Sequence, residues 1–171
     1  MFDNDTIVIR NAQIITRNFT GTVRNKFDTE GKRYIIVRLD PEDAENLKAD
    51  GWPIKITKPN PEKPDYEPYP YLKVNLKEHF YFHGLRKVSR VYMVTKKNKI
   101  LLDPNDFHQL EENYIEKADL KIDHVYYKTF DQWSVVLESG FFTIEPDELY
   151  DEYFGESMGP VIDDDEDNPF M

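Results

Sequence analysis

The sequence contains no cysteine, which excludes a disulfide framework, a thiolate nucleophile and a cysteine metal site. It also lacks any apolar run near the roughly 20 residues that cross a bilayer, and its first residues lack the pattern of a secretion signal. Its seven glycines form neither a phosphate-binding loop nor a nucleophile elbow. We therefore expect a soluble, cytoplasmic protein that is not an enzyme and needs neither a cofactor nor a metal.

Positive charge is scarce as well, since 22 Lys and Arg residues stand against 33 Asp and Glu residues and give a net charge of -11. This balance alone argues against a nucleic-acid partner, because carboxylates repel phosphates. The distribution reverses the argument: residues 145–171 hold 11 of the acids and no base, so residues 1–144 carry 22 acids and 22 bases. Within that neutral part the bases cluster, with seven in residues 10–38 and six, without any acid, in residues 79–102.

Most of the neutral part alternates apolar and polar side chains with the period of two that is typical of half-buried strands. The expected strands are rich in Ile, Val, Tyr and Phe and span residues 6–19, 33–39, 52–57, 70–76, 87–95, 120–127 and 133–143. Short helices are expected from Pro41 to a stop at Gly51, from Pro104 to Tyr114 and from Pro146 to Gly155. Strands with short helices between them favour a small, mainly β barrel over a sandwich or a βαβ sheet.

Two segments stand apart from this pattern. Residues 58–70 hold five prolines and predict a stiff loop that projects from the barrel. From residue 156 onward the composition cannot bury enough apolar surface to fold alone. We therefore expect one domain, residues 1–155, followed by a flexible acidic tail, residues 156–171.

Several predicted strand faces carry aromatic rings beside cations. In residues 70–76, for example, Tyr71 and Lys73 share the face opposite Leu72 and Val74. Single-stranded nucleic acids bind to such faces because bases stack on rings, at about 1–3 kcal/mol each, while cations follow the backbone. The alternative is that these rings pack in the core or in cross-strand pairs, as we expect for Trp52. The residues predicted to contact DNA are Arg17, Phe19, Arg33, Tyr34, Arg38, Tyr71, Lys73, Arg86, Lys87, Arg90 and Tyr92.

The acidic segment, residues 163–171, reads DDDEDNPFM. Charge runs commonly serve solubility alone, but that role does not explain an aromatic residue beside the acids. Carboxylates would steer the ring toward a basic rim on a partner, and the ring would supply contact energy. The same carboxylates imitate a phosphate chain, so they would also compete with DNA for the protein's own basic groove. The residues predicted to bind partners are Asp163, Asp164, Asp165, Glu166, Asp167, Pro169 and Phe170.

The stretch DDDEDNPF resembles the acidic tip of bacterial single-stranded DNA-binding proteins, although Met171 follows the phenylalanine here and Asn168 replaces an apolar residue. The rest of the chain is similar to a phage family of such proteins, through RNFTG (17–21), LDPEDAENLKADGW (39–52), PYLKV (70–74) and GFFTIEPDEL (140–149). The resemblance implies an OB-fold with a five-stranded barrel that coats single-stranded DNA without sequence preference. It also implies a tip that recruits replication, recombination and repair proteins in the cytoplasm of a bacterial host.

Other interpretations remain open from the sequence. The main one is an interaction module or acidic DNA mimic that binds a DNA-processing enzyme and never touches DNA; it predicts dispersed basic residues. Two weaker ones are an Asn-Pro-Phe ligand for a eukaryotic adaptor domain, at residues 168–170, and a magnesium-dependent nuclease. A homo-oligomer is also left open.

Overall fold

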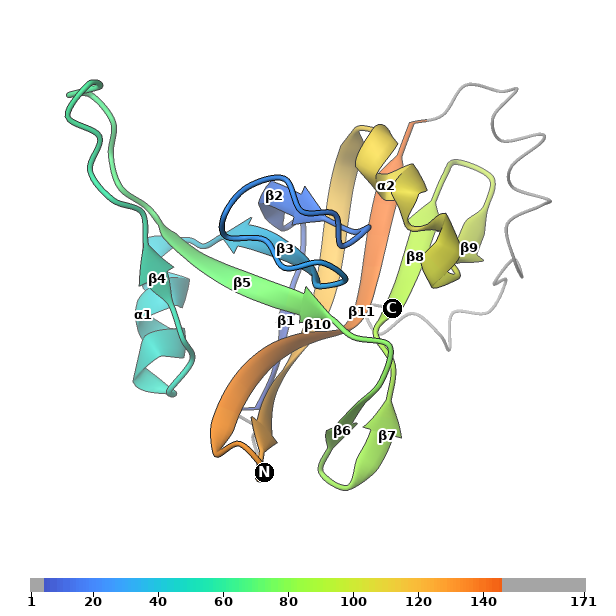
Figure 1. Ribbon diagram of the computed structural model, residues 1–171. Helices are drawn as coiled ribbons and strands as arrows, with labels where there is room; N and C mark the ends of the chain where they lie inside the picture. The colour runs from blue at the N-terminus through green and yellow to red at the C-terminus, as the bar shows by residue number, and fades with distance from the viewer. Residues whose placement is uncertain (1–4, 146–171) are drawn as a thin grey trace.

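The computed structural model describes residues 5–145, and in this range the protein is mainly β (Figure 1). The helices are α1 Pro41–Ala49, the 3-10 helix η1 Pro104–Asp106 and α2 His108–Glu112. The strands are β1 Thr6–Ile9, β2 Gln13–Asn18, β3 Arg33–Arg38, β4 Lys55–Ile56, β5 Pro70–Leu76, β6 Phe80–Phe82, β7 Leu85–Lys87, β8 Arg90–Val94, β9 Lys99–Leu101, β10 Ile115–Tyr127 and β11 Gln132–Ile144. The third predicted helix and the acidic segment lie outside the described residues.

Nine of these strands form one sheet, whose main path runs β1-β10-β11-β5-β3-β2. Strand β4 pairs with β5, and β8 pairs with β9 and β11, while β6 and β7 form a separate hairpin. All pairings are antiparallel except those of β11 with β5 and with β8, which are parallel. The long strands β10 and β11 therefore join the two halves of the sheet (Figure 1).

The sheet is not closed into a barrel by strand pairing among the described residues. Where closure would occur, the Ala12 N–H donates to the Ala118 carbonyl at 2.7 Å. Beside this bond, a cavity of about 250 Å³ separates β2 from the start of β10. A register shift between Ile14 and Thr16 marks a bulge in β2, and bulges increase local twist, which turns a strand away from a prospective partner. The prediction of a mainly β protein is thus confirmed, while the predicted five-stranded barrel is not closed in residues 5–145, where nine strands form an open sheet.

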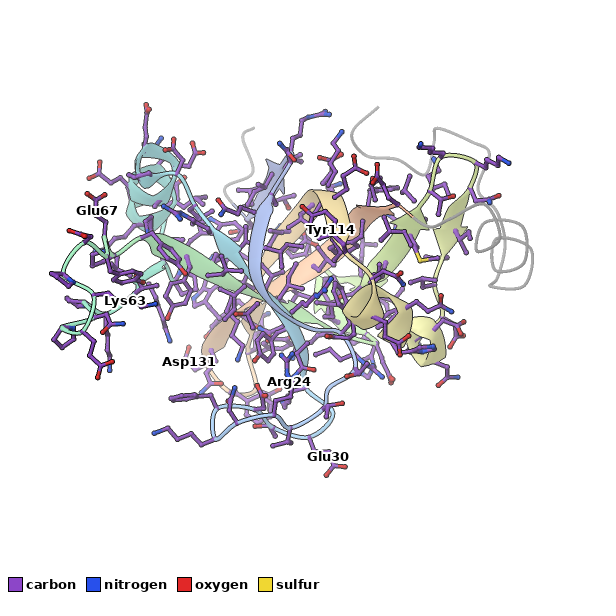
Figure 2. All side chains as sticks on the ribbon, turned by 90° about the horizontal axis from the view of Figure 1, so that it is seen from above. Arg24, Glu30, Lys63, Glu67, Tyr114 and Asp131 are labelled. Carbon is purple, nitrogen blue, oxygen red and sulfur yellow. The ribbon has the colours of Figure 1, made fainter. Side chains whose placement is uncertain are left out.

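The structure confirms the predicted secondary structure best where proline and glycine mark the ends of an element. Helix α1 begins at Pro41 and ends before Gly51, whose φ of +91° suits glycine. The expected strand 6–19 is divided into β1 and β2 around Asn11, which has a φ of +52°. The proline-rich segment lies between β4 and β5 and projects from the sheet (Figure 1), and it carries Lys63 and Glu67 at one edge of the molecule (Figure 2). Tyr114, expected on a helix, is instead exposed after the end of α2.

The core lies between the inner faces of the sheet and its short helices. Strand β5 contributes Leu72, Val74 and Leu76, all buried, at alternate positions. Phe19 meets Phe142 edge to face, with ring centroids 5.2 Å apart. A Cβ atom at Gly140 would lie 2.6 Å from the Phe142 ring, so glycine is required for this ring to pack.

Both tryptophans of the protein flank one buried histidine, His124. Its ring lies 4.8 Å from the Trp52 ring and 4.5 Å from the Trp133 ring, measured between centroids. Burial lowers the pKa of His124, and the nearby Asp5 opposes this shift. Histidine in the unfolded chain has a pKa of 6.5 and therefore binds a proton more tightly than His124 does in the folded state. The folded state consequently loses stability as the pH falls below 6.5.

We predict that His124→Phe, which keeps a ring but cannot be charged, flattens this pH dependence. The wild-type free energy of unfolding should fall between pH 7.5 and pH 5.5, with a contribution from His124 of at most about 1.4 kcal/mol per pH unit. Urea unfolding followed by circular dichroism measures both proteins, and His79→Phe, at an exposed histidine, serves as the control. Identical slopes for wild type and His124→Phe would contradict the prediction.

Candidate nucleic-acid interface

The outer face of β3 and β5 brings tyrosines and cations into register. Since Leu72 and Val74 face the core, Tyr71 and Lys73 must face the other way. In the antiparallel pairing of the two strands, Arg38 lies opposite Tyr71, and Tyr34 lies opposite Asn75. The side chains of two strands therefore form one row on one surface.

Cations in this row sit against aromatic rings. The Arg38 guanidinium is 4.4 Å from the centre of the Tyr69 ring, and Lys73 Nζ is 4.4 Å from the centre of the Tyr34 ring. Farther along, Lys77 Nζ is 5.4 Å from the Tyr127 ring of β10. Within residues 5–145 none of these three cations pairs with a carboxylate, so no described acid competes with an external anion for them. We call this row the cation–ring stripe; it comprises Lys32, Tyr34, Arg38, Tyr69, Tyr71, Lys73, Lys77 and Tyr127.

The end of the stripe concentrates positive charge. Burial lowers the pKa of Lys77, and repulsion from Lys32 lowers it further. Both effects disfavour the charged ammonium, and a bound anion would offset them. This end of the stripe is therefore suited to a phosphate.

Tyr34 also anchors the loop between β2 and β3 to the stripe. Its hydroxyl donates to Asp28 Oδ1 at 2.5 Å, and the Arg24 N–H donates to Asp28 Oδ2 at 2.9 Å. The bond from Tyr34 is the main cause of the lowered pKa of Asp28, while burial, more than Asp28, raises the pKa of Tyr34. The base of the loop closes through a bond from the Gly31 N–H to the Gly21 carbonyl at 2.9 Å. The loop then presents Phe27, 77% exposed, with Lys26 Nζ 5.2 Å from its ring.

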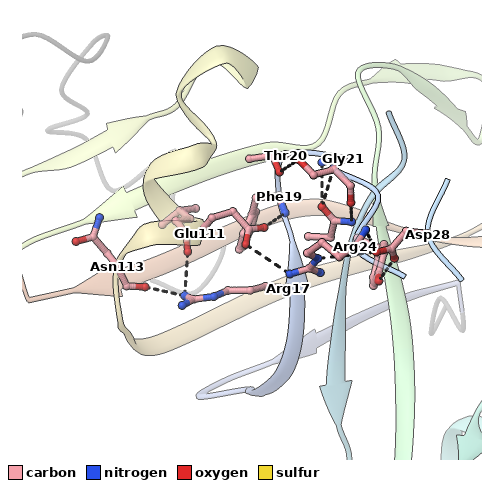
Figure 3. A network of polar contacts seen from close by, with 12 residues as sticks. Arg17, Phe19, Thr20, Gly21, Arg24, Asp28, Glu111 and Asn113 are labelled. Atoms are coloured by element: carbon pink, nitrogen blue, oxygen red, sulfur yellow. Dashed lines mark hydrogen bonds and ion pairs between the residues drawn. The ribbon is translucent and has the colours of Figure 1, made fainter. Parts of the chain in front are cut away.

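Arg17 and Phe19, both predicted to contact DNA, lie off the stripe and make structural contacts. The Arg17 guanidinium donates to the carbonyls of Leu110 and Asn113, at 2.9 and 2.7 Å, and so fastens α2 to β2 (Figure 3). Phe19 is fully buried, and its N–H donates to the Glu111 carboxylate. An aromatic side chain on an alternating strand can face the core or the solvent, and the Phe19 ring packs in the core. Both residues therefore lie outside the cation–ring stripe.

Three further predicted residues lie away from the stripe, around β8. The Tyr92 ring is buried in a parallel stack with Phe141, with centroids 4.4 Å apart. Lys87 Nζ lies 3.2 Å from Asp123 and 3.5 Å from Glu138, and Arg90 lies 3.7 Å from Glu138. Burial, and then Glu138, raise the pKa of Asp123, so these carboxylates need the cations as neighbours. Lys87 and Arg90 therefore neutralise internal carboxylates, and together with Tyr92 they lie outside the stripe.

The remaining predictions fall into two groups. The stripe includes Tyr34, Arg38, Tyr71 and Lys73. Arg33 lies in register with Leu76, the last residue of β5. Arg86 is exposed on the separate hairpin β6–β7. The basic residues of 79–102 are thus dispersed, whereas those of β3 and β5 are gathered on one face.

Exposed rings that sequence reasoning missed lie in two connections. Phe27 stands in the β2–β3 loop, and Phe130, 70% exposed, stands in the β10–β11 turn beside Trp133, 55% exposed. The signal for Phe27 was its place among the bases of residues 10–38. Nothing in the local sequence distinguished Phe130 from a core aromatic.

Among residues 5–145, no group of three or more His, Asp or Glu residues is arranged to hold a metal ion. No helix in the same range is long and apolar enough to cross a membrane.

Comparison with known proteins places the chain in a family. Residues 2–167 match the family model described as "Putative phage ssDNA-binding domain". No curated protein matches the sequence. The match covers all the described strands, including the cation–ring stripe. The chain therefore belongs to this phage family of single-stranded DNA-binding domains.

Proposed function

We propose that the protein binds single-stranded DNA along the cation–ring stripe and coats it without sequence preference during phage DNA replication, recombination and repair. One observation carries the proposal: in a chain with an excess of acids, the cations of this face contact rings and no described carboxylate. The phage family supports DNA as the ligand. The proposal places the protein in the host cytoplasm, acting without catalysis.

The stripe has the chemistry and length for several nucleotides. Alternate residues on a strand lie about 7 Å apart, so Tyr71 to Lys77 spans about 20 Å. Cations along this line would follow the phosphates, and the half-buried rings of Tyr69, Tyr71 and Tyr127 would stack against bases. Tyr34 is only 6% exposed, so its part is to hold Lys73 and the β2–β3 loop. Because every base has a flat face, stacking tolerates any sequence.

We also propose that the sheet is a variant of the OB-fold. That fold is a five-stranded, partly open Greek-key barrel that binds oligonucleotides on strands 2 and 3 and on loops 1–2 and 4–5. If β2, β3, β5, β10 and β11 are the five strands, then the stripe lies on strands 2 and 3. The two loops are then those that expose Phe27 and Phe130. The path β10-β11-β5-β3-β2 supports this assignment.

The acidic segment, residues 163–171, would regulate the stripe. Its five consecutive carboxylates are complementary to the stripe cations, so we propose that it competes with DNA and, once displaced, recruits replication or recombination proteins through Pro169 and Phe170. The segment lies outside the described residues, and its charge alone supports this role.

The main rival is an interaction module or DNA mimic that never binds DNA. The dispersed cations of residues 79–102 fit it, whereas the gathered cations of the stripe favour DNA binding.

The direct test is a titration of fluorescein-labelled oligo-dT followed by anisotropy. We expect binding at low salt, a linear fall of log affinity with log salt, and similar affinity for oligo-dC. Double-stranded DNA of equal length, whose bases cannot stack on the stripe, should bind more weakly. An absence of binding to both single strands at low salt would refute the proposal.

The stripe itself is tested by Lys73→Gln. We expect weaker binding to every sequence, and a salt slope smaller by about 0.7, the value for one lost phosphate contact on a single strand. Lys48→Gln, at an exposed lysine on α1, is the matched control and should retain the wild-type slope. Equal slopes for all three proteins would remove the stripe as the binding face.

The regulatory role is tested by truncation after Ser157. We expect affinity for oligo-dT to rise, and the gain to shrink at high salt, because competition between charges is screened. A full-length protein with Asp163, Asp164 and Asp165 changed to Asn should show part of the same gain. Unchanged or weaker binding by the truncated protein would exclude competition by the segment.

A further inference from the structure

A cavity of about 460 Å³ opens at the end of β5, between this strand and the region of β9 and η1. Its volume lies within the range typical of sites for small organic groups, about 300–1,000 Å³. Apolar side chains provide much of the wall, among them Leu76, Val88, Leu101 and Phe107. Charged residues at the same cavity are the cations Arg33, Lys77 and Arg90 and the acids Glu78 and Asp103. Arg33 pairs with Glu78 and Arg90 with Glu138, so Lys77 is the lining cation that no described carboxylate neutralises. Such a lining suits a flat apolar group that carries polar atoms at its edge, with an anion held at Lys77.

The backbone around the cavity is braced. The Ser89 hydroxyl accepts from the Lys77 N–H at 2.9 Å and donates to the Leu137 carbonyl at 2.6 Å. The Ser89 N–H donates to the Lys77 carbonyl at 2.9 Å. Lys77 is therefore held at a defined place between the stripe and the cavity.

Arg33 has unused hydrogen-bonding capacity in this cavity. Its guanidinium lies 5.5 Å from the centre of the Phe107 ring, and Nη1 is 3.5 Å from the Glu78 carboxylate. Its Nε is buried and has no hydrogen-bond partner. Nε itself is closed to the cavity, but the Arg33 side chain is 22% exposed, so an acceptor on a ligand would bind to the accessible part of the guanidinium. The carbonyl oxygens and ring nitrogens of nucleobases are such acceptors.

Lys77 belongs to both features. Its ammonium group lies over Tyr127 at the end of the stripe, and the residue also lines the cavity. Arg33 and Leu76 occupy the face of β3 and β5 opposite to the stripe, so the bound DNA would turn around the end of β5 at Lys77 to enter the cavity.

We propose that this cavity takes the base of one nucleotide of the bound strand, which turns out of the row of stacked bases and inserts between Phe107 and the apolar wall. Arg33 donates to the edge of the base, and Lys77 holds the adjacent phosphate. The inference rests on the proposed function and adds a fixed position at which one nucleotide is held more tightly than its neighbours.

Filling the cavity tests this inference. Val88 is 48% exposed where it lines the cavity, so Val88→Trp fills space at little cost to the core. Val8, also 48% exposed but on the edge strand β1, provides the matched control Val8→Trp. We expect Val88→Trp to weaken oligo-dT binding about 5- to 150-fold, the loss that corresponds to one stacked base, and Val8→Trp to bind as wild type. Unchanged or tighter binding by Val88→Trp would overturn the inference.

A second measurement uses the unmodified protein and does not depend on how the variant folds. Oligo-dT with one 5-iododeoxyuridine, moved along the strand, is photocross-linked, and the attached residue is identified by mass spectrometry. We expect one position to cross-link to Phe107. Cross-links confined to the tyrosines of the stripe would overturn the cavity inference while leaving the proposed function intact. Failure of wild type to bind oligo-dT would overturn both.

Discussion

The antiparallel pairing of β3 with β5 is the constraint on which the proposed interface depends. Because Leu72, Val74 and Leu76 are committed to the core, the intervening residues of β5 must face outward. The register then places Arg38 opposite Tyr71 and sets cations beside rings. A slip of one residue would bury the lysine and expose the leucines, so the core that stabilises the fold also determines the surface offered to a ligand.

Charge is used in two different ways on this sheet. Around β8 the cations meet the buried carboxylates Asp123 and Glu138, and their charges are spent on internal compensation. On the stripe the cations rest on tyrosine rings, which hold them in place without neutralising them. Net charge therefore says little about the capacity of this protein for DNA; what matters is which cations have carboxylates as neighbours.

Polar side chains attach the β2–β3 loop and helix α2 to the sheet, and the β2–β3 loop adds an exposed ring near the stripe. Asp28 links the β2–β3 loop to Tyr34, and Arg17 links α2 to β2 through two carbonyls. In a closed barrel, hydrogen bonds between neighbouring strands would hold these segments in place. Here the side-chain hydrogen bonds hold them. They leave an opening between β2 and β10 while still holding the β2–β3 loop, with the exposed ring of Phe27, near the stripe.

The sequence by itself determined the mainly β class, helix α1, the projecting proline-rich segment and the outward face of β5, because alternation, proline and glycine act through neighbours in the chain. It could not separate Tyr71, on the stripe, from Phe19, in the core, since both stand on alternating strands beside a cation. Nor could it foresee that Lys87 and Arg90 meet Asp123 and Glu138, which lie 36 to 51 residues away in the chain. Only the tertiary structure decided these points, because burial and ion pairing depend on which strands become neighbours, and long-range contacts set that choice.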